Sequence, residues 1–325
     1  MKNIIVLHSY NQGYLWTDAE MDGINSVLKH DGTGVELHIT YMDAKRMRTD
    51  ESDVLLHRLL ASKMEKICFD GVIVCDNDAF EFARSRKEDI FKGIPVVFCG
   101  INDFSRDKLS GWPTCTGIVE NQDYMGACEI GFRLFPSVRK VFVISDDTTT
   151  GRAHFEEIKK IESKLPRKTF TCWNFSAHPM SETMKEVKGL GPDSMVLLLS
   201  FFRDGDGIVY SMEDAVEQIM SVAKVPVFTG NDSRIMFGVL GGKVVVGRDQ
   251  GAYAASIMKE ILNGAALASI PVKTDALTRY SFDHHALLRF GISFSSLPPG
   301  STIINNPPPF YSVDKPLFYA ILTSL

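Results

Sequence analysis

The sequence predicts an α/β fold with two Rossmann-like lobes, each built on a parallel sheet and joined by a hinge. Short apolar, β-branched runs alternate with helical patterns along most of the chain, and solid apolar strands between helices are typical of doubly wound parallel sheets. The strand and helix series begins twice, at the N-terminus and again at about Val141, with no flexible linker between the two sets. The 325 residues are enough for two domains that each bury a core.

The individual elements follow from two periodicities. Apolar residues at positions 54, 55, 59, 60 and 64, for example, recur at the spacing of one helix face. By the same criterion the expected helices are residues 19–28, 54–64, 79–86, 124–134, 151–164, 181–188, 211–223 and 251–262. The expected strands are the apolar runs at residues 4–7, 35–41, 72–75, 96–99, 117–119, 141–144, 169–173, 195–199, 225–228 and 244–246.

Composition and charge exclude several classes of protein. The formal net charge of −5 gives no electrostatic basis for binding nucleic acid. The sequence has no apolar run of about 18 residues, the length that a membrane-spanning helix needs. The start lacks a basic segment followed by a long apolar one, which leaves two alternatives: a cytoplasmic protein, or an exported one whose leader lies outside this sequence.

The cysteines favour buried free thiols. No two of the six are spaced as C-x-x-C, which argues against a zinc ribbon or a thioredoxin-like redox motif. Cys75, Cys99 and Cys115 lie in apolar runs, where a thiol behaves as a small hydrophobic group. The even count leaves disulfides open as an alternative.

Known catalytic motifs are missing from the sequence. There is no phosphate-binding loop, dinucleotide fingerprint, nucleophile elbow or H-E-x-x-H zinc motif. His8 and Ser9 are adjacent on an expected strand end, and such neighbours point in opposite directions. Asp76 and Asp78 lack a phosphate cradle or a matched base, so turn capping or ligand binding is favoured over metal or acid–base chemistry. We therefore expect no catalytic residue, no cofactor and no metal site.

Polar residues follow six of the expected strands at the end where parallel sheets bind their ligands. Any one of them could simply cap the next helix, but six clusters together favour a binding cleft between the lobes. The clusters are residues 8–11, 76–78, 100–103, 145–151, 200–203 and 230–232.

Two features suggest what such a cleft would hold. Residues 148–151 lead into an expected helix, whose free backbone N–H groups could anchor the acidic end of a ligand. Several aromatic residues lie beside the polar clusters, which makes stacking on an apolar ligand plausible, although core packing is the commoner role. These aromatic residues are Tyr10, Tyr14, Trp16, Phe201 and Phe202.

An ordered set of segments resembles a known family. The segments are NIIVLHSYNQGYLWTDAEMDGI, CDNDAF, VFCGINDF, GIVENQDY, ISDDTTTG and LLLSFFRDGDGIVYSMEDA, with the region from residue 238 to the proline-rich stretch. They resemble the extracytoplasmic sensor domains of bacterial membrane receptors of the histidine kinase or diguanylate cyclase type. These sensors are related to ABC-transporter substrate-binding proteins with the type I periplasmic-binding fold.

The resemblance implies a domain division with several hinge crossings. The first lobe would comprise residues 1–120 plus about 248–268, and the second residues 121–247 plus about 270–300. The crossings would fall near residues 120–122 and 247–250. Residues 301–325 would be a proline-rich juxtamembrane tail, since Pro307, Pro308 and Pro309 favour an extended path. Aromatic residues around Lys315 are typical of a membrane interface.

The resemblance also implies a function without catalysis. The chain would sense a small organic ligand, such as an amino-acid-like metabolite, outside the cytoplasm, in a membrane-anchored receptor for which a homodimer is one option. A periplasmic binding component of an ABC importer is the main alternative, and an enzyme on the same scaffold is a third. The family's pocket positions carry over to the strand-end residues Ser9, Tyr10, Trp16, Asp76, Asn77, Asn102, Asp146, Thr148, Thr149, Ser200, Phe201, Asn231 and Asp232.

Overall fold

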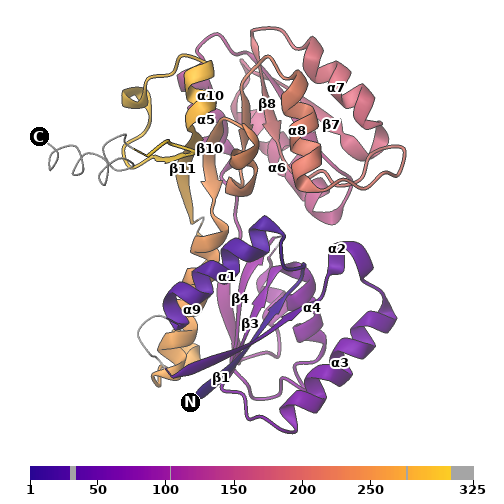
Figure 1. The fold of residues 1–325 in the computed structure, drawn as a ribbon, viewed down its shortest axis with the longest axis vertical. Helices are drawn as coiled ribbons and strands as arrows, with labels where there is room; N and C mark the ends of the chain where they lie inside the picture. Colours follow the sequence, from indigo (N-terminus) through magenta and orange to yellow (C-terminus); the bar gives the residue numbers. More distant parts are fainter. Residues whose placement is uncertain (30–33, 103, 276, 309–325) are drawn as a thin grey trace, which may run out of the picture.

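The two-lobed α/β architecture that the sequence predicts is confirmed. The computed structural model describes residues 1–29, 34–102, 104–275 and 277–308. Two lobes lie end to end, each with its own sheet (Figure 1). Both sheets are parallel apart from one antiparallel pair in the second lobe.

The first lobe is a five-stranded parallel sheet in the order β2-β1-β3-β4-β5. Ile4 and Val6 of β1 pack with the helices α1 and α9, whereas Ile5 and Leu7 pack on the opposite face with Phe80 of α4. Side chains on both faces are therefore buried, as expected for a covered parallel sheet. The strands are β1 (Lys2–His8), β2 (Val35–Tyr41), β3 (Gly71–Cys75), β4 (Val96–Ile101) and β5 (Cys115–Val119), and the α-helices are α1 (Leu15–Leu28), α2 (Ala44–Met47), α3 (Asp50–Met64) and α4 (Asp76–Ser85).

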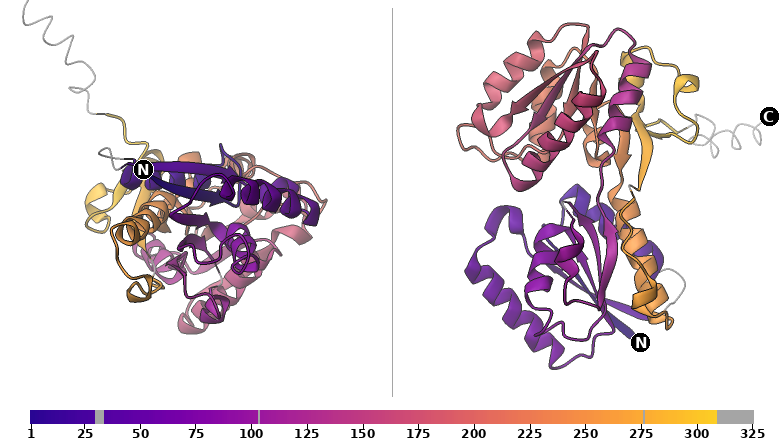
Figure 2. Two further views of the ribbon diagram at one scale, coloured as in Figure 1. Left: turned by 90° about the horizontal axis from the view of Figure 1, so that it is seen from below. Right: turned by 180° about the vertical axis from the view of Figure 1, so that it is seen from behind.

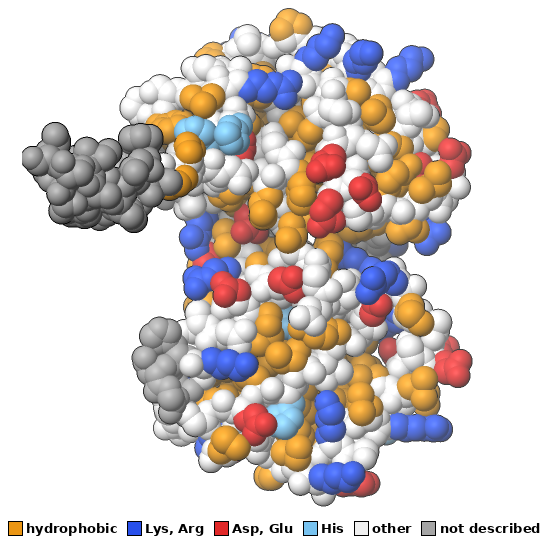
Figure 3. Space-filling view, in the orientation of Figure 1, with side chains coloured by type: hydrophobic (Ala, Val, Ile, Leu, Met, Phe, Trp, Pro, Cys, Tyr) orange, Lys and Arg blue, Asp and Glu red, His pale blue; other side chains and the backbone are white. Residues whose placement is uncertain are grey.

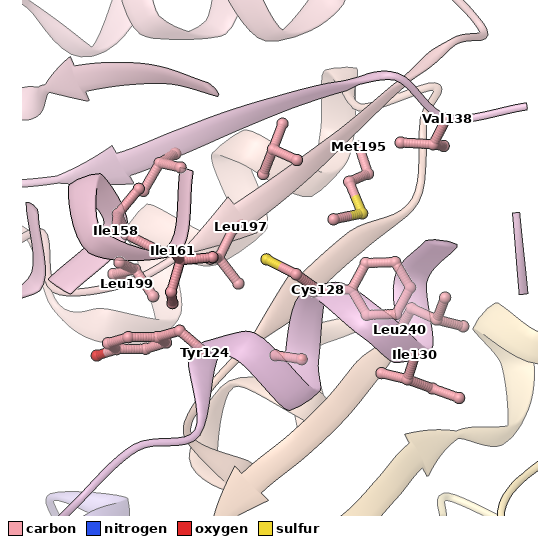
Figure 4. Close-up of a cluster of buried hydrophobic side chains, with 14 of the residues drawn as sticks. Tyr124, Cys128, Ile130, Val138, Ile158, Ile161, Met195, Leu197, Leu199 and Leu240 are labelled. Carbon is pink, nitrogen blue, oxygen red and sulfur yellow. The ribbon is translucent and has the colours of Figure 1, made fainter. Parts of the chain in front are cut away.

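The second lobe contains a seven-stranded sheet in the order β12-β11-β10-β9-β8-β6-β7. One of its cores gathers side chains from α5, α6 and the central strands, among them Cys128, Ile158 and Leu197 (Figure 4). The strands are β6 (Lys140–Ser145), β7 (Thr169–Asn174), β8 (Ser194–Leu198), β9 (Val227–Thr229), β10 (Gly241–Val245), β11 (Thr278–Asp283) and β12 (Thr302–Ile304). The α-helices are α5 (Tyr124–Leu134), α6 (Thr149–Lys164), α7 (Met180–Gly189), α8 (Met212–Val222) and α10 (His284–Arg289).

Three segments of chain connect the lobes (Figure 2). The first joins β5 to α5, and the second is the junction of β10 with α9 (Gly247–Leu262), which returns along the first lobe beside α1. Residues 270–274 then run along β5, where the Val119 amide donates to the Lys273 carbonyl at 3.0 Å. The third crossing therefore follows residue 274, a few residues later than the boundary near 270 that we expected.

Glycines allow α9 to lie against α1. A Cβ atom on Gly23 would lie 2.0 Å from the Arg248 carbonyl oxygen, and one on Gly251 would lie 2.0 Å from the Glu20 carbonyl oxygen. Any larger residue at either position would separate the helices. This close contact fixes the hinge end of α9 to the first lobe.

The C-terminal boundary differs from the expectation. Residues 302–304 form β12, which pairs with β11, so the second lobe continues past residue 300. Hydrophobic patterning missed both strands because β11 is half polar and β12 is only three residues long. Residues 309–325 lie outside the described residues, and the juxtamembrane tail stays a prediction for them. None of the helices in the described ranges is both long and apolar enough to cross a bilayer.

Candidate ligand-binding cleft

A cavity of about 500 Å³ lies between the lobes and is lined by residues from both. It is placed beyond the carboxyl ends of β1, β3 and β4 on one side and of β6, β8 and β9 on the other. The waist between the two lobes is visible on the molecular surface (Figure 3). This is the position at which open parallel sheets bind ligands.

A buried carboxyl group forms the floor of the cleft in the first lobe. Asp76 follows β3 directly, adopts a left-handed backbone with φ of 68° and is 3% exposed. Its Oδ1 accepts a hydrogen bond from Trp16 Nε1 at 2.9 Å, while its Oδ2 has no partner among the described residues. Burial, reinforced by Glu20 and Glu120, raises the pKa of Asp76 well above its usual value. A cationic group of a ligand would offset the negative charge of the Asp76 carboxylate.

A second carboxyl group lies at the first hinge crossing. Glu120 accepts hydrogen bonds from Gln122 Nε2 at 3.0 Å and from Asn102 Nδ2 at 3.2 Å. Asn77 Oδ1 in turn accepts from the Asn102 amide at 3.0 Å. Burial raises the pKa of Glu120 to about 7. The network links the hinge to the strand ends of the first lobe.

Lys45 of α2 contacts aromatic rings from both lobes. Its Nζ lies 4.2 Å from the ring centre of Tyr10, 3.9 Å from that of Tyr14 and 3.9 Å from that of Phe202. It also donates to Tyr14 Oη at 2.6 Å. Part of Lys45 stays accessible through the open cleft, but desolvation lowers the pKa of its ammonium. Because Phe202 belongs to the second lobe, this contact bridges the cleft.

The cleft extends past these rings into a neighbouring cavity of about 490 Å³. The two cavities share four lining residues: Tyr14, Lys45, Thr148 and Phe202. The ring cluster therefore lies where the two cavities meet.

Hydroxyl and amide groups form most of the wall in the second lobe. Thr148 caps α6: its Oγ1 accepts from the Gly151 amide at 3.1 Å and donates to Asp146 Oδ1 at 2.5 Å. Asn231 caps the next turn, with its Oδ1 accepting from the Ser233 amide at 3.0 Å. Thr150 and Ser200 complete this part of the wall. Thr148 and Asn231 therefore both cap the start of a helix and line the cleft.

The second lobe also contributes a buried cation. Arg234 is 9% exposed; its Nη1 lies 3.4 Å from Thr229 Oγ1, and its Nε has no hydrogen-bond partner among the described residues. Burial lowers its pKa, although Tyr14, Tyr124 and Glu120 counteract this effect. His154 lies nearby, and burial together with Arg234 lowers the pKa of its imidazole to about 3. The guanidinium is therefore available to a ligand anion.

Most of the residues expected from sequence line the cleft, and four do not. Those that line it are Tyr10, Trp16, Asp76, Asn77, Asn102, Thr148, Ser200 and Asn231. Those that do not are Ser9, Asp146, Phe201 and Asp232. The side chain of Thr149 lies outside what the structure describes. No ligand contact is tested by this placement, so ligand binding by the lining residues stays a prediction.

The four residues outside the lining have structural roles. Ser9 Oγ donates to the Cys75 carbonyl at 2.7 Å and accepts from the Ala79 amide at 2.8 Å, so it joins β1 to β3 and α4. Phe201 is 3% exposed and belongs to a core of the second lobe. From the sequence, we expected these two residues to face the cleft, because each follows a strand. In the structure, Ser9 and Phe201 point into the interior of their lobes instead.

The two acidic residues outside the lining are also accounted for. Asp146 is buried and accepts from the backbone amide and the hydroxyl of Thr148, so it supports the α6 cap. Asp232 lies near Gly247 at the second hinge crossing, and burial raises its pKa to about 6. Both stabilise turns around the cleft.

Several residues that line the cleft were not predicted from the sequence to bind ligand. Tyr14 and Phe202 were noted for their aromatic rings, and Asp78 belongs to a strand-end cluster. Glu120 and Gln122 lie at the crossing that the resemblance places there. Thr150 belongs to the strand-end cluster 145–151. Nothing in the local pattern singles out the others, because they come from helices and turns further from the strand ends: Lys45, Glu81, Lys108, His154 and Arg234.

Residues 17–296 match the family model described as ABC transporter substrate binding protein. The chain belongs to this family. The match spans both lobes. It includes every residue that lines the first cavity except Tyr10, Tyr14 and Trp16, which precede residue 17. Membership implies binding of a small ligand rather than catalysis, and an extracytoplasmic location. No curated protein matches the sequence.

Several solved structures share the fold at low sequence identity. A ligand-free, open substrate-binding protein with adhesive properties from Clostridium difficile has a TM-score of 0.68 and 14% identity, covering 94% of this chain and 100% of its own. An ABC domain from Streptococcus pneumoniae in complex with L-Trp has a TM-score of 0.67 and 15% identity, covering 93% and 99%. A conserved domain protein from Vibrio cholerae has a TM-score of 0.65 and 17% identity, covering 93% and 99%.

Proposed function

We propose that this substrate-binding protein is the extracytoplasmic sensing domain of a membrane-anchored receptor, which closes on a small organic ligand and signals to a cytoplasmic output module. The observation that carries ligand binding is the cleft itself, in which buried charged groups face each other from two lobes. Binding would stabilise the closed arrangement by the ligand's higher affinity for it. The output module would be a histidine kinase of a two-component system or a diguanylate cyclase, in a homodimeric parent receptor.

The ligand that fits this chemistry is a zwitterion with an apolar or aromatic part. Asp76 and Glu120 suit an ammonium group, and Arg234 suits a carboxylate. The rings of Tyr10 and Trp16 provide surface for the apolar part. The likeness to a domain solved with L-Trp is consistent with an amino-acid-like ligand.

Ligand binding is tested by thermal shift and titration calorimetry with a panel of metabolites. At about 100 times its dissociation constant a ligand stabilises the folded state by roughly 2.7 kcal/mol. We expect aromatic or other apolar amino acids to raise the melting temperature and to reduce the radius of gyration in X-ray scattering. The absence of any shift with amino acids, purines, sugars and carboxylic acids would contradict the proposal.

A binding component of an ABC importer is the second candidate, favoured by the description of the matching family. The sensor is preferred because Phe310, Tyr311, Phe318 and Tyr319 surround Lys315 in a pattern typical of a membrane interface. The coding sequence downstream of Leu325 discriminates the two. An in-frame kinase or cyclase region supports the sensor, and a stop codon beside permease genes supports the importer.

A further inference from the structure

Three residues of the first lobe form a row across its sheet, below the cleft. His8 of β1 is the register partner of Cys75 of β3, and Cys75 is the register partner of Cys99 of β4. Register partners on adjacent strands point to the same face of a sheet. Cys75 and Cys99 pack in the core under α1 and α9, and Glu20 of α1 meets the row from above.

Three distances within this cluster match those between the ligands of one tetrahedral ion. His8 Nδ1 lies 3.7 Å from Glu20 Oε2, Cys99 Sγ lies 3.7 Å from Glu20 Oε1, and the two sulfur atoms are 3.6 Å apart. The donor atoms of His8, Glu20 and Cys75 all lie within 4.8 Å of one another. Cys99 lies outside this group of three but contacts Cys75 and Glu20, so an adjustment of its side chain would bring it in as a fourth ligand. Metal–ligand bonds of about 2.0–2.3 Å with tetrahedral angles place ligand atoms about 3.3–3.8 Å apart.

The cluster also contains polar atoms whose burial nothing else explains. The side chains of His8 and Glu20 are 0% exposed. Neither ring nitrogen of His8, nor Oε2 of Glu20, has a hydrogen-bond partner among the described residues. Buried polar atoms are nearly always paired, because an unpaired one costs about 1–3 kcal/mol. A neutral imidazole carries a proton on one nitrogen and a lone pair on the other, so one nitrogen of His8 and Oε2 of Glu20 are left to bind a partner that accepts lone pairs.

The surrounding charges favour a cation as that partner. Glu20 and Asp76 are both buried, and a Cβ atom on Gly100 would lie 2.7 Å from Glu20 Oε1 and 2.7 Å from Asp76 Oδ1, so the two carboxyl groups lie close together. A divalent ion between Glu20 and the thiols would offset this excess of acidic groups.

We propose that His8, Glu20, Cys75 and Cys99 form a buried Zn²⁺ site, which ties β1, β3, β4 and α1 together beneath the ligand cleft. Imidazole, thiolate and carboxylate groups are the donors that Zn²⁺ uses, whereas Mg²⁺ and Ca²⁺ take oxygen ligands. On binding, each thiol releases its proton to solvent, so affinity falls as the pH is lowered. No change of oxidation state is involved.

The site would also position the floor of the cleft. Asp76 directly follows the ligand Cys75, and Trp16 lies one helical turn before the ligand Glu20. The hydrogen bond between Trp16 and Asp76 therefore joins two segments that the ion would hold. Metal and cleft ligand should each strengthen the binding of the other.

The decisive experiment titrates the chelator-treated, reduced full chain with Co²⁺ and then with Zn²⁺. We expect one equivalent of Co²⁺ to give a thiolate charge-transfer band and the intense visible bands of tetrahedral coordination, both removed by Zn²⁺. Zinc should also raise the melting temperature. A weak octahedral spectrum would overturn the proposal, as would a Cys75–Cys99 disulfide in non-reducing peptide mapping of the native protein.

Cysteine variants provide a matched comparison. Cys99→Ser should lose the charge-transfer intensity of one thiolate and weaken Zn²⁺ binding at least about 10-fold, as expected when a ligand is removed. Cys115→Ser alters a buried thiol of the same lobe that lies outside the cluster, and should leave both unchanged. Equal loss in the two variants would overturn the assignment. If Cys99→Ser does not fold, the spectrum of the unmodified chain still decides between the outcomes.

Discussion

The two walls of the cleft are built from different chemistry. The first lobe presents the carboxyl groups of Asp76 and Glu120, the ammonium of Lys45 and several aromatic rings. The second lobe presents the hydroxyl groups of Thr150 and Ser200, the amide of Asn231 and a single buried guanidinium. Most of the charge that a ligand would meet is therefore on the first lobe.

This difference suggests a division of labour during binding. Asp76 is held by Trp16, and Glu120 by Asn102 and Gln122, so the first lobe is organised before any ligand arrives. The groups of the second lobe complete the site when the lobes close. Variants of the first lobe should therefore have the larger effects on affinity, and those of the second lobe the smaller ones.

The largest expected effect is on stability and concerns Glu120. Burial raises its pKa from 4.5 to about 7, so between these pH values the folded state holds a proton that the unfolded chain has released. This stabilisation is complete below pH 4.5 and is lost as the pH rises through 7. At about 1.36 kcal/mol per unit of pKa, it amounts to roughly 3 kcal/mol.

Glu120→Gln should remove this pH dependence, because the amide stays neutral. Urea unfolding at acidic and mildly alkaline pH should show the variant gaining roughly 3 kcal/mol on the unmodified protein as the pH rises. His8 and His154, whose pKa values burial lowers to about 4 and about 3, act in the opposite sense, but they are common to both proteins. If the free energy of unfolding changed with pH in the same way for both proteins, Glu120 would be ionised in the folded state.

The next effect concerns the floor of the first lobe. Asp76→Asn should weaken binding of a cationic ligand roughly 100-fold, since a buried charge-assisted hydrogen bond contributes about 1.5–3 kcal/mol. The asparagine oxygen can still accept from Trp16, which preserves the fold. Asp89→Asn alters an exposed aspartate of the same lobe that pairs with His57 and lies outside both cavities, and it is the control in titration calorimetry. Equal losses of affinity in the two variants would show that Asp76 does not contact the ligand.

A smaller loss is expected for the cation of the second lobe. Arg234→Met should weaken binding of an amino acid roughly 30-fold, corresponding to about 2 kcal/mol, by removing the partner of the ligand carboxylate. The effect should vanish for the matching amine that lacks the carboxylate. Arg167→Met alters an exposed arginine of the second lobe that lines neither cavity and serves as the control. A loss larger than that of Asp76→Asn would reverse the proposed order of the two lobes.

The smallest effect is expected for a hydroxyl group of the second lobe. Thr150→Val keeps the shape of the side chain and should weaken binding about 5-fold, since a neutral hydrogen bond contributes about 1 kcal/mol. Thr169→Val, exposed at the start of β7, should have no effect on affinity. An unchanged dissociation constant for Thr150→Val would mean that the α6 terminus takes no part in binding.

The sequence predicted the strand ends well and the rest of the cleft poorly. Asp76, Asn102 and Asn231 were found because a polar residue directly after an apolar strand is placed by the strand itself. Lys45 and Arg234 were missed because α2 and the turn after Asn231 bring them to the cleft only through tertiary packing. Ser9 and Phe201 were included although neighbouring positions alternate in direction, and both turn inward.

The sequence by itself determined the two sheets and the helices that cover them, because apolar periodicity is a local property of the chain. It also determined which segment ends face the cleft. Tertiary structure decided what no local pattern records: the residues that reach the cleft from α2 and the hinge, and the row of His8, Cys75 and Cys99 under Glu20. The reason is physical, since strand order and register bring together residues far apart in sequence, and burial then shifts their pKa values.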